Sequence, residues 1–237
     1  MKKHFKIGIY GDSLVMPRPG FVNKNDRYFT QLCNYFKEKD YDLEVFEKAR
    51  ASIPIAEVRQ WVLNDNVYYE DRGDVLIIHL GIVDCAPRPV SLKTRNRISK
   101  LPEFIRKHII SYIHNNRAKL LTNGGHRVTP LNSFNAIYNK IVEIGLQQYN
   151  KIFLINICPT LPETELHSPG LSASINMYNS VIYEIMDKYK DEKSLKLIDI
   201  NSILLQQSDL KKYILPDGHH IFPSTHQLIF EEIVKSL

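Results

Sequence analysis

Two short motifs at opposite ends of the chain carry residues that together could perform nucleophilic catalysis. Gly11-Asp12-Ser13 follows an apolar segment near the N-terminus, and Asp217-Gly218-His219-His220 stands near the C-terminus. A serine hydroxyl is a weak nucleophile until a base takes its proton, and a neutral imidazole held by a carboxylate is the usual base. These residue types predict Ser13 as the nucleophile, His220 as the base and Asp217 as the acid that orients the base.

Other interpretations of the C-terminal motif stay open. His219 is a rival base, although the Asp-x-x-His spacing lets Asp217 and His220 belong to one turn and converge on the serine. A metal site is the second alternative, since Asp217, His219, His220 and His226 lie close together in the sequence. Cysteine ligands and an inward-facing histidine pair at helical spacing, which are typical of such sites, are missing. We therefore expect no metal and no cofactor.

The two motifs make the chain resemble the SGNH (GDSL) hydrolases. The first block of that family is Gly-Asp-Ser and its last block is Asp-x-x-His, and both occur here in the right order near the two ends. The resemblance covers essentially the whole chain. It implies a serine esterase or deacylase that acts on carboxylic esters through an acyl-enzyme formed on Ser13.

The third block of the family gives a more specific resemblance. Residues 81–88 read Gly-Ile-Val-Asp-Cys-Ala-Pro-Arg, which is similar to a bacterial subgroup associated with surface-polysaccharide loci. That context implies an O-acylated carbohydrate or glycan precursor as the substrate, by analogy alone. A carbohydrate O-acyltransferase that uses the same three residues is an alternative function.

The oxyanion hole is where the sequence departs from the family pattern. The third block of the family is Gly-x-Asn-Asp, and Val83 stands where the asparagine donor is expected; losing such a donor can cost about 100- to 1000-fold in turnover. The loop 48–53 also lacks the glycine of the second block. We assign Ala51, Ser52, Gly81 and Asp84 to the oxyanion and substrate-binding region. The two departures also motivate a weakly active glycan-binding protein as a further alternative.

Two arginines near these loops are candidate substrate contacts. Arg50 lies in the loop 48–53, and Arg88 ends the third block. A guanidinium can hold a carboxylate or a phosphate through two parallel hydrogen bonds. A structural role, in which each arginine bonds the loop backbone, is equally open.

The elements that position these residues follow from hydrophobic patterning. Short runs rich in Ile, Val, Leu and Phe predict buried parallel strands at 5–10, 42–46, 74–80, 151–157 and 195–200. Helical patterns occur at 26–39, 54–69, 101–116, 133–149, 172–189 and 224–236. This alternation predicts an α/β fold, a three-layer doubly wound parallel sheet of about five strands, with ligands at the C-terminal strand ends. The arrangement is that of SGNH hydrolases and is flavodoxin-like.

The segment 85–132 is longer than a simple crossover requires. We expect one domain over residues 1–237, in which this segment is an elaborated crossover that shapes the substrate pocket. Between Arg88 and Arg127 it holds ten Lys or Arg residues and a single acid, Glu103, against a net charge of +5 for the whole chain. Such clustering favours an anionic partner, with a solvated basic face as the alternative. Nucleic acid is not expected, because no binding motif accompanies the charge.

Other features limit the environment of the chain. No apolar run reaches the roughly 18 residues that a membrane span needs. The sequence Met1-Lys2-Lys3-His4 leads directly into the first strand without a signal-peptide pattern, so we expect a cytoplasmic protein. Cys33, Cys85 and Cys158 are isolated and predict buried thiols, with a reactive Cys85 as the alternative. The sequence carries no signal for an oligomeric state.

Overall fold

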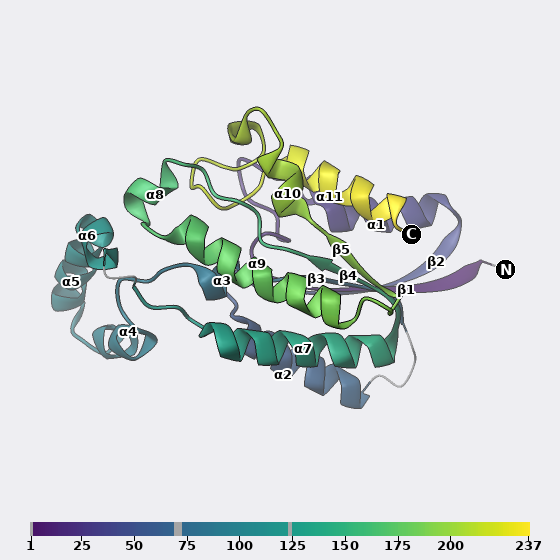
Figure 1. Ribbon diagram of the computed structural model, residues 1–237, viewed down its shortest axis with the longest axis horizontal. Helices are drawn as coiled ribbons and strands as arrows, with labels where there is room; N and C mark the ends of the chain where they lie inside the picture. The colour runs from purple at the N-terminus through teal and green to yellow at the C-terminus, as the bar shows by residue number, and fades with distance from the viewer. Residues whose placement is uncertain (1, 69–72, 123–124) are drawn as a thin grey trace.

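A computed structural model describes residues 2–68, 73–122 and 125–237 of the chain. Its centre is a parallel sheet of five strands in the order β2-β1-β3-β4-β5 (Figure 1). The strands are β1 (Lys3–Gly11), β2 (Tyr41–Ala49), β3 (Gly73–His79), β4 (Tyr149–Ile155) and β5 (Leu195–Ile198). The predicted doubly wound α/β fold is confirmed.

The central strands are mainly apolar along their buried parts because helices cover both faces of the sheet. Ile9 of β1 and Ile77 of β3 face one hydrophobic core, whereas Tyr10 and Ile78 face the other. All four side chains are buried. Successive residues of a strand point to opposite faces, so a sheet covered on both sides needs a continuous hydrophobic run rather than alternation.

Two layers of helices cover the sheet (Figure 1). On one face lie α1 (Tyr28–Glu38), α10 (Ile200–Leu205) and α11 (Pro223–Lys235). On the other face lie α2 (Ile55–Tyr68), α7 (Leu131–Gln148) and α9 (Leu171–Lys188). The helices predicted at 26–39, 133–149, 172–189 and 224–236 match α1, α7, α9 and α11 closely. The predicted end of the helix 54–69 falls just outside the described residues.

The crossover from β3 to β4 carries a group of short helices before it reaches α7. They are α3 (Ile82–Cys85), α4 (Leu92–Ser99), α5 (Glu103–Asn115) and α6 (Arg117–Leu121). Helices α4, α5 and α6 project beyond the end of the sheet (Figure 1), and α5 has no buried residue. A two-way backbone pair between Arg88 and His126, at 2.8 Å in each direction, closes the base of this projection.

The remaining short elements are α8 (Thr164–His167), η1 (Lys24–Asp26) and η2 (Leu210–Lys212). Within the described ranges, no helix is long and apolar enough to cross a membrane. The three cysteines are buried free thiols, as their isolated positions predict.

Candidate active site

Ser13 stands in a tight turn at the C-terminal end of β1. The backbone N–H of Asp12 donates to the carbonyl of His79 at 3.3 Å, and the N–H of Leu14 donates to Asp12 Oδ1 at 2.9 Å. A Cβ on Gly11 would lie 2.2 Å from Val15 Cγ2, so glycine permits the close approach of the turn. The serine is thereby placed where the strand order reverses between β1 and β3, the position at which doubly wound sheets bind ligands.

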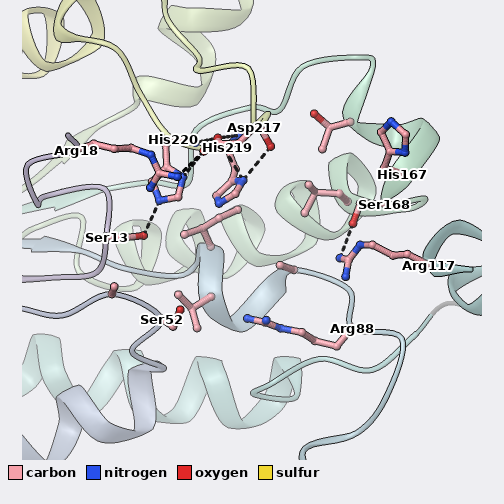
Figure 2. A pocket seen from close by; sticks show the side chains of 16 residues that line it. Ser13, Arg18, Ser52, Arg88, Arg117, His167, Ser168, Asp217, His219 and His220 are labelled. Atoms are coloured by element: carbon pink, nitrogen blue, oxygen red, sulfur yellow. Dashed lines mark hydrogen bonds and ion pairs between the residues drawn. The ribbon is translucent and has the colours of Figure 1, made fainter. Parts of the chain in front are cut away.

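The side chains of Ser13, His220 and Asp217 form one chain of hydrogen bonds (Figure 2). His220 Nε2 lies 3.0 Å from Ser13 Oγ, and His220 Nδ1 lies 2.9 Å from Asp217 Oδ2. An ionised carboxylate accepts only, which assigns the imidazole proton to Nδ1 and leaves Nε2 free to accept from the serine hydroxyl. This is the arrangement in which an imidazole can act as base toward a serine.

The loop that carries Asp217 and His220 is held in one conformation by its own hydrogen bonds. Asp217 Oδ1 accepts from the backbone N–H of His219 at 3.2 Å and of His220 at 3.0 Å. Gly218 has a φ of 83°, and a Cβ there would lie 1.8 Å from Thr164 Oγ1. The turn therefore requires glycine and directs both functional side chains toward Ser13.

Arg18 is a further partner of the carboxylate that the sequence did not single out. Its guanidinium donates to Asp217 Oδ2 at 2.8 Å. Burial alone would raise the pKa of Asp217, but hydrogen bonds from the side chain and backbone of His220 bring it well below its ordinary value. Asp217 is thus ionised at neutral pH. The segment Pro17-Arg18-Pro19-Gly20 is typical of a turn, but nothing in it points to residue 217.

His219 lies beside His220, with ring centroids 4.2 Å apart, and its Nδ1 is 3.1 Å from the carbonyl of Asp217. Burial and the neighbouring His220 lower the pKa of His219. Of the two histidines, His220 is the one hydrogen-bonded to Ser13 in the described part of the chain.

The four-residue metal site considered from the sequence does not assemble. The possible ligand atoms of Asp217, His219 and His220 lie within 4.8 Å of one another. His226 is elsewhere: it is buried in α11, its Nδ1 accepts from the backbone N–H of Tyr28 at 3.4 Å, and burial lowers its pKa to about 3. Of the three residues that do lie together, Asp217 and His220 already hydrogen-bond each other through Oδ2 and Nδ1.

A cavity of about 470 Å³ opens beside Ser13 and His220, a size typical of small-molecule sites. Figure 2 shows Ser13 and His220 on one side and Arg117 on the other, with Arg88 between them and its guanidinium directed toward Ser52. The lining residues are Ser13, Arg18, Ala51, Ser52, Ile82, Val83, Ala86, Arg88, Arg117, Thr164, His167, Ser168, Leu171, Asp217, His219 and His220.

Three residues assigned to the substrate region from the sequence do not line this cavity. The guanidinium of Arg50 pairs with Glu57 instead. Asp84 is buried and accepts from the backbone N–H of Ile55 at 3.1 Å and from the hydroxyl of Thr129, so it ties the crossover to the start of α2. Gly81 precedes α3 with a φ of 129°, a conformation that side chains rarely adopt.

The alternative that Cys85 is a reactive thiol is wrong. Its side chain is completely buried and donates to the carbonyl of Ile82 at 3.6 Å. Burial raises the pKa of the Cys85 thiol far above its ordinary value, which disfavours the thiolate that reactivity needs.

Ala51, Ser52 and Val83 border the cavity beside Ser13, where an oxyanion would need donors. Val83 offers no side-chain donor. Ser52 has a φ of 59°, the left-handed conformation that glycine favours, so a serine adopts the backbone shape of the missing glycine. Within the described ranges, the backbone N–H groups of Ser13, Ala51 and Ser52 donate to no protein acceptor. They are therefore available to a ligand.

Comparisons with known proteins find similarity in structure. No family model matches the chain, and no curated protein matches it by sequence. A lipase/acylhydrolase from Enterococcus faecalis matches with a TM-score of 0.66 and 13% identity, over 98% of this chain and 94% of the other. An acetylxylan esterase from Geobacillus stearothermophilus matches with a TM-score of 0.61 and 13% identity, over 99% and 94%.

A member of the lipolytic G-D-S-L family from Veillonella parvula matches with a TM-score of 0.60 and 9% identity, over 98% of this chain and 97% of the other. The matches thus extend over nearly the full length of each protein. At such low identity they show the fold: the chain has the α/β fold of GDSL-type esterases and acylhydrolases.

Asp12, next to the serine, carries a buried carboxyl whose protonation depends on the fold. The side chain is fully buried, and Oδ2 has no hydrogen-bond partner among the described residues. Burial raises the pKa of Asp12 to about 7, and the charge of the nearby Asp84 adds to this rise. The hydrogen bond from the backbone N–H of Leu14 opposes it. The folded state therefore keeps a proton on Asp12 that the unfolded chain releases near pH 4.

We predict that Asp12→Asn stabilises the protein relative to wild type increasingly as pH rises from 4 to 7. A group whose folded pKa is raised contributes stability that is full below the unfolded pKa and is lost as pH rises through the folded pKa. At about 1.4 kcal/mol per pKa unit, the difference in free energy of unfolding between the variant and wild type should grow by on the order of 4 kcal/mol over this pH range. Urea unfolding of both proteins between pH 4 and 7.5 measures it.

The same substitution at the exposed Asp191 controls for the loss of one charge. A constant difference in free energy of unfolding caused by the new amide does not affect the test, because the prediction concerns how that difference changes with pH. A difference between Asp12→Asn and wild type that stays flat from pH 4 to 7.5 would contradict the raised pKa of Asp12.

Proposed function

We propose that this protein is a serine esterase or deacylase that acts on an O-acylated carbohydrate or glycan precursor through an acyl-enzyme. The observation that carries the proposal is the hydrogen-bonded series Ser13–His220–Asp217 at the edge of a cavity of about 470 Å³. The fold shared with esterases and acylhydrolases supports it independently of the three residues.

In the proposed reaction, Ser13 Oγ attacks the carbonyl carbon of the ester while its proton passes to His220 Nε2. Asp217 stays ionised and stabilises the imidazolium that forms. Collapse of the tetrahedral intermediate breaks the bond to the alcohol, which takes the proton from His220 and leaves an acyl group on Ser13. Water then attacks this acyl-enzyme with His220 as base, and Ser13 is regenerated as the acid departs.

The oxyanion of each tetrahedral intermediate would be stabilised by backbone donors. Ser13, Ala51 and Ser52 line the cavity, and their backbone N–H groups have no protein acceptor in the described ranges. Preorganised donors of this kind act where charge develops, and each is worth about 3 to 4 kcal/mol. We assign Val83, Ile82 and Ala86 to the apolar wall beside them.

Support for a carbohydrate ester comes from two sources. The similar structure from Geobacillus stearothermophilus is described as an acetylxylan esterase. The third sequence block, Gly81 to Arg88, resembles that of proteins associated with surface polysaccharides. The same three residues would also serve transfer of the acyl group to a sugar hydroxyl, which an acceptor sugar added to the assay distinguishes from hydrolysis by a fall in free acid.

We predict that wild type releases acetate from acetylated xylo-oligosaccharides and hydrolyses 4-nitrophenyl acetate. Ser13→Ala and His220→Gln should each lower kcat/KM at least about 1000-fold, and the double variant should lose little more, because the residues act as a unit. His219→Gln should cost far less than His220→Gln, since within the described residues it is His220 that is hydrogen-bonded to Ser13. The substitution His108→Gln, on exposed α5, is the matched control.

Undiminished turnover by Ser13→Ala would contradict the proposal, whatever the substrate. Equal losses in the His219 and His220 variants would contradict the choice of base. A chelator in the assay should leave wild-type turnover unchanged, because the reaction uses no metal.

A second prediction concerns Val83, a residue of the cavity wall whose side chain has no hydrogen-bond donor. Val83→Asn should raise kcat on 4-nitrophenyl acetate about tenfold or more, because its amide can donate to the oxyanion across the cavity. Val83→Leu fills a similar volume without a donor and should give no rise. If the asparagine and leucine variants show the same kcat, position 83 does not limit stabilisation of the oxyanion.

A further inference from the structure

Two arginines that line the cavity have no carboxylate partner among the described residues. Arg88 and Arg117 both line the cavity and are half-buried. Within the described ranges, neither takes part in an ion pair closer than 4.0 Å, in contrast to Arg18, which pairs with Asp217. Arg88 Nε is buried and has no hydrogen-bond partner in the described part of the chain.

The electrostatic surroundings of this pair are unfavourable in the empty cavity. Burial lowers the pKa of Arg88, and the nearby Arg95 lowers it further. Burial likewise lowers the pKa of Arg117, with an added contribution from Arg88. Asp84 attracts Arg88, but its oxygens are occupied by Ile55 and Thr129. Two like charges partly withdrawn from water without a counter-charge cost free energy, which a bound anion would offset.

The positions of both arginines are fixed by the surrounding loops. Arg117 donates through one terminal nitrogen to the carbonyl of Pro87 and to Ser168 Oγ, both at 2.9 Å. The backbone of Arg88 pairs in both directions with His126. A guanidinium offers five N–H donors, so most donors of this pair remain for a ligand. Binding an anion would therefore require little reorganisation of the protein.

We propose that Arg88 and Arg117 form an anion subsite for a carboxylate or phosphate on the carrier of the acyl group. Both groups present coplanar or clustered oxygens that a guanidinium grips through parallel hydrogen bonds. The substrate class is then an O-acylated acidic sugar, either a uronate or a sugar phosphate. Its ester and its anionic group lie within one cavity of about 470 Å³. The anion subsite stands on its own geometry, whereas its role in ester recognition rests on the proposed function.

The test measures binding directly, without turnover. Isothermal titration of wild type with glucuronate, glucose 1-phosphate and glucose compares a carboxylate, a phosphate and a neutral sugar. At least one anionic sugar should bind about tenfold or more tightly than glucose. Whichever of the two binds more tightly identifies the source of the negative charge.

Variants then assign the preference to the two arginines. Arg88→Gln should lose at least about tenfold in affinity for the anionic sugar, a larger loss than any it causes for glucose. Arg117→Lys keeps the charge without the planar fork and should lose severalfold. Arg97→Gln, on exposed α4, removes one charge outside the cavity and is the matched control. If Arg88→Gln does not fold, Arg88→Lys provides the same comparison as Arg117→Lys.

The outcomes separate this proposal from the proposed function. Equal affinity of wild type for glucose and for both anionic sugars, or equal losses in the Arg88 and Arg97 variants, would overturn the subsite. Hydrolysis of neutral 4-nitrophenyl acetate by the same preparation would then still support the esterase. Conversely, selective anion binding lost in Arg88→Gln, in a protein that hydrolyses no ester, would support the subsite and remove the esterase.

Discussion

The hydrogen bond between Ser13 Oγ and His220 Nε2 is the interaction on which the rest of the account depends. It joins residues 207 positions apart across 3.0 Å. A parallel sheet makes this possible, because every strand ends at the same edge and the connections return behind the sheet. The turn after β1 delivers the serine, and the loop before α11 delivers the histidine and its carboxylate. Gly11 and Gly218 allow the close approaches that both turns need.

Two parts of the cavity differ in their electrostatics. Near Ser13, Asp217 accepts hydrogen bonds from His220, Arg18 and backbone N–H groups. Its negative charge therefore balances the positive charge of Arg18. Along the rest of the cavity, Arg88 and Arg117 have no such counterpart among the described residues. A substrate that is neutral at its ester and negative at its carrier would match both parts. In the proposed anion subsite, two arginines of the basic crossover would hold the substrate, while basic residues such as Lys93 and Arg97 are exposed.

Much of the fold could be predicted from the sequence because burial on both faces of the sheet forces long apolar runs, as in β3 and β4. The short helices α4 and α6 could not: α4 is basic and exposed along most of its length, and α6 has five residues, too few to show a hydrophobic period. The spacing of Asp217 and His220 carried enough information to place them in one turn. The direction of a side chain cannot be predicted from the sequence in the same way. We expect Arg50 in the substrate-binding region from the sequence, but its guanidinium pairs with Glu57. Arg18, in a turn, and Arg117, at the start of α6, were missed because a single arginine carries no signal of which distant residues it will meet.

The central claim is that Ser13 is activated by His220, and intact-protein mass spectrometry after exposure to a reactive organophosphate tests it most directly. Such reagents form a stable adduct only with a serine whose hydroxyl is activated as a nucleophile. We expect one adduct on wild type and none on Ser13→Ala under the same conditions. Wild type that stays unmodified under conditions that label a known serine esterase, or an adduct that persists in Ser13→Ala, would contradict it.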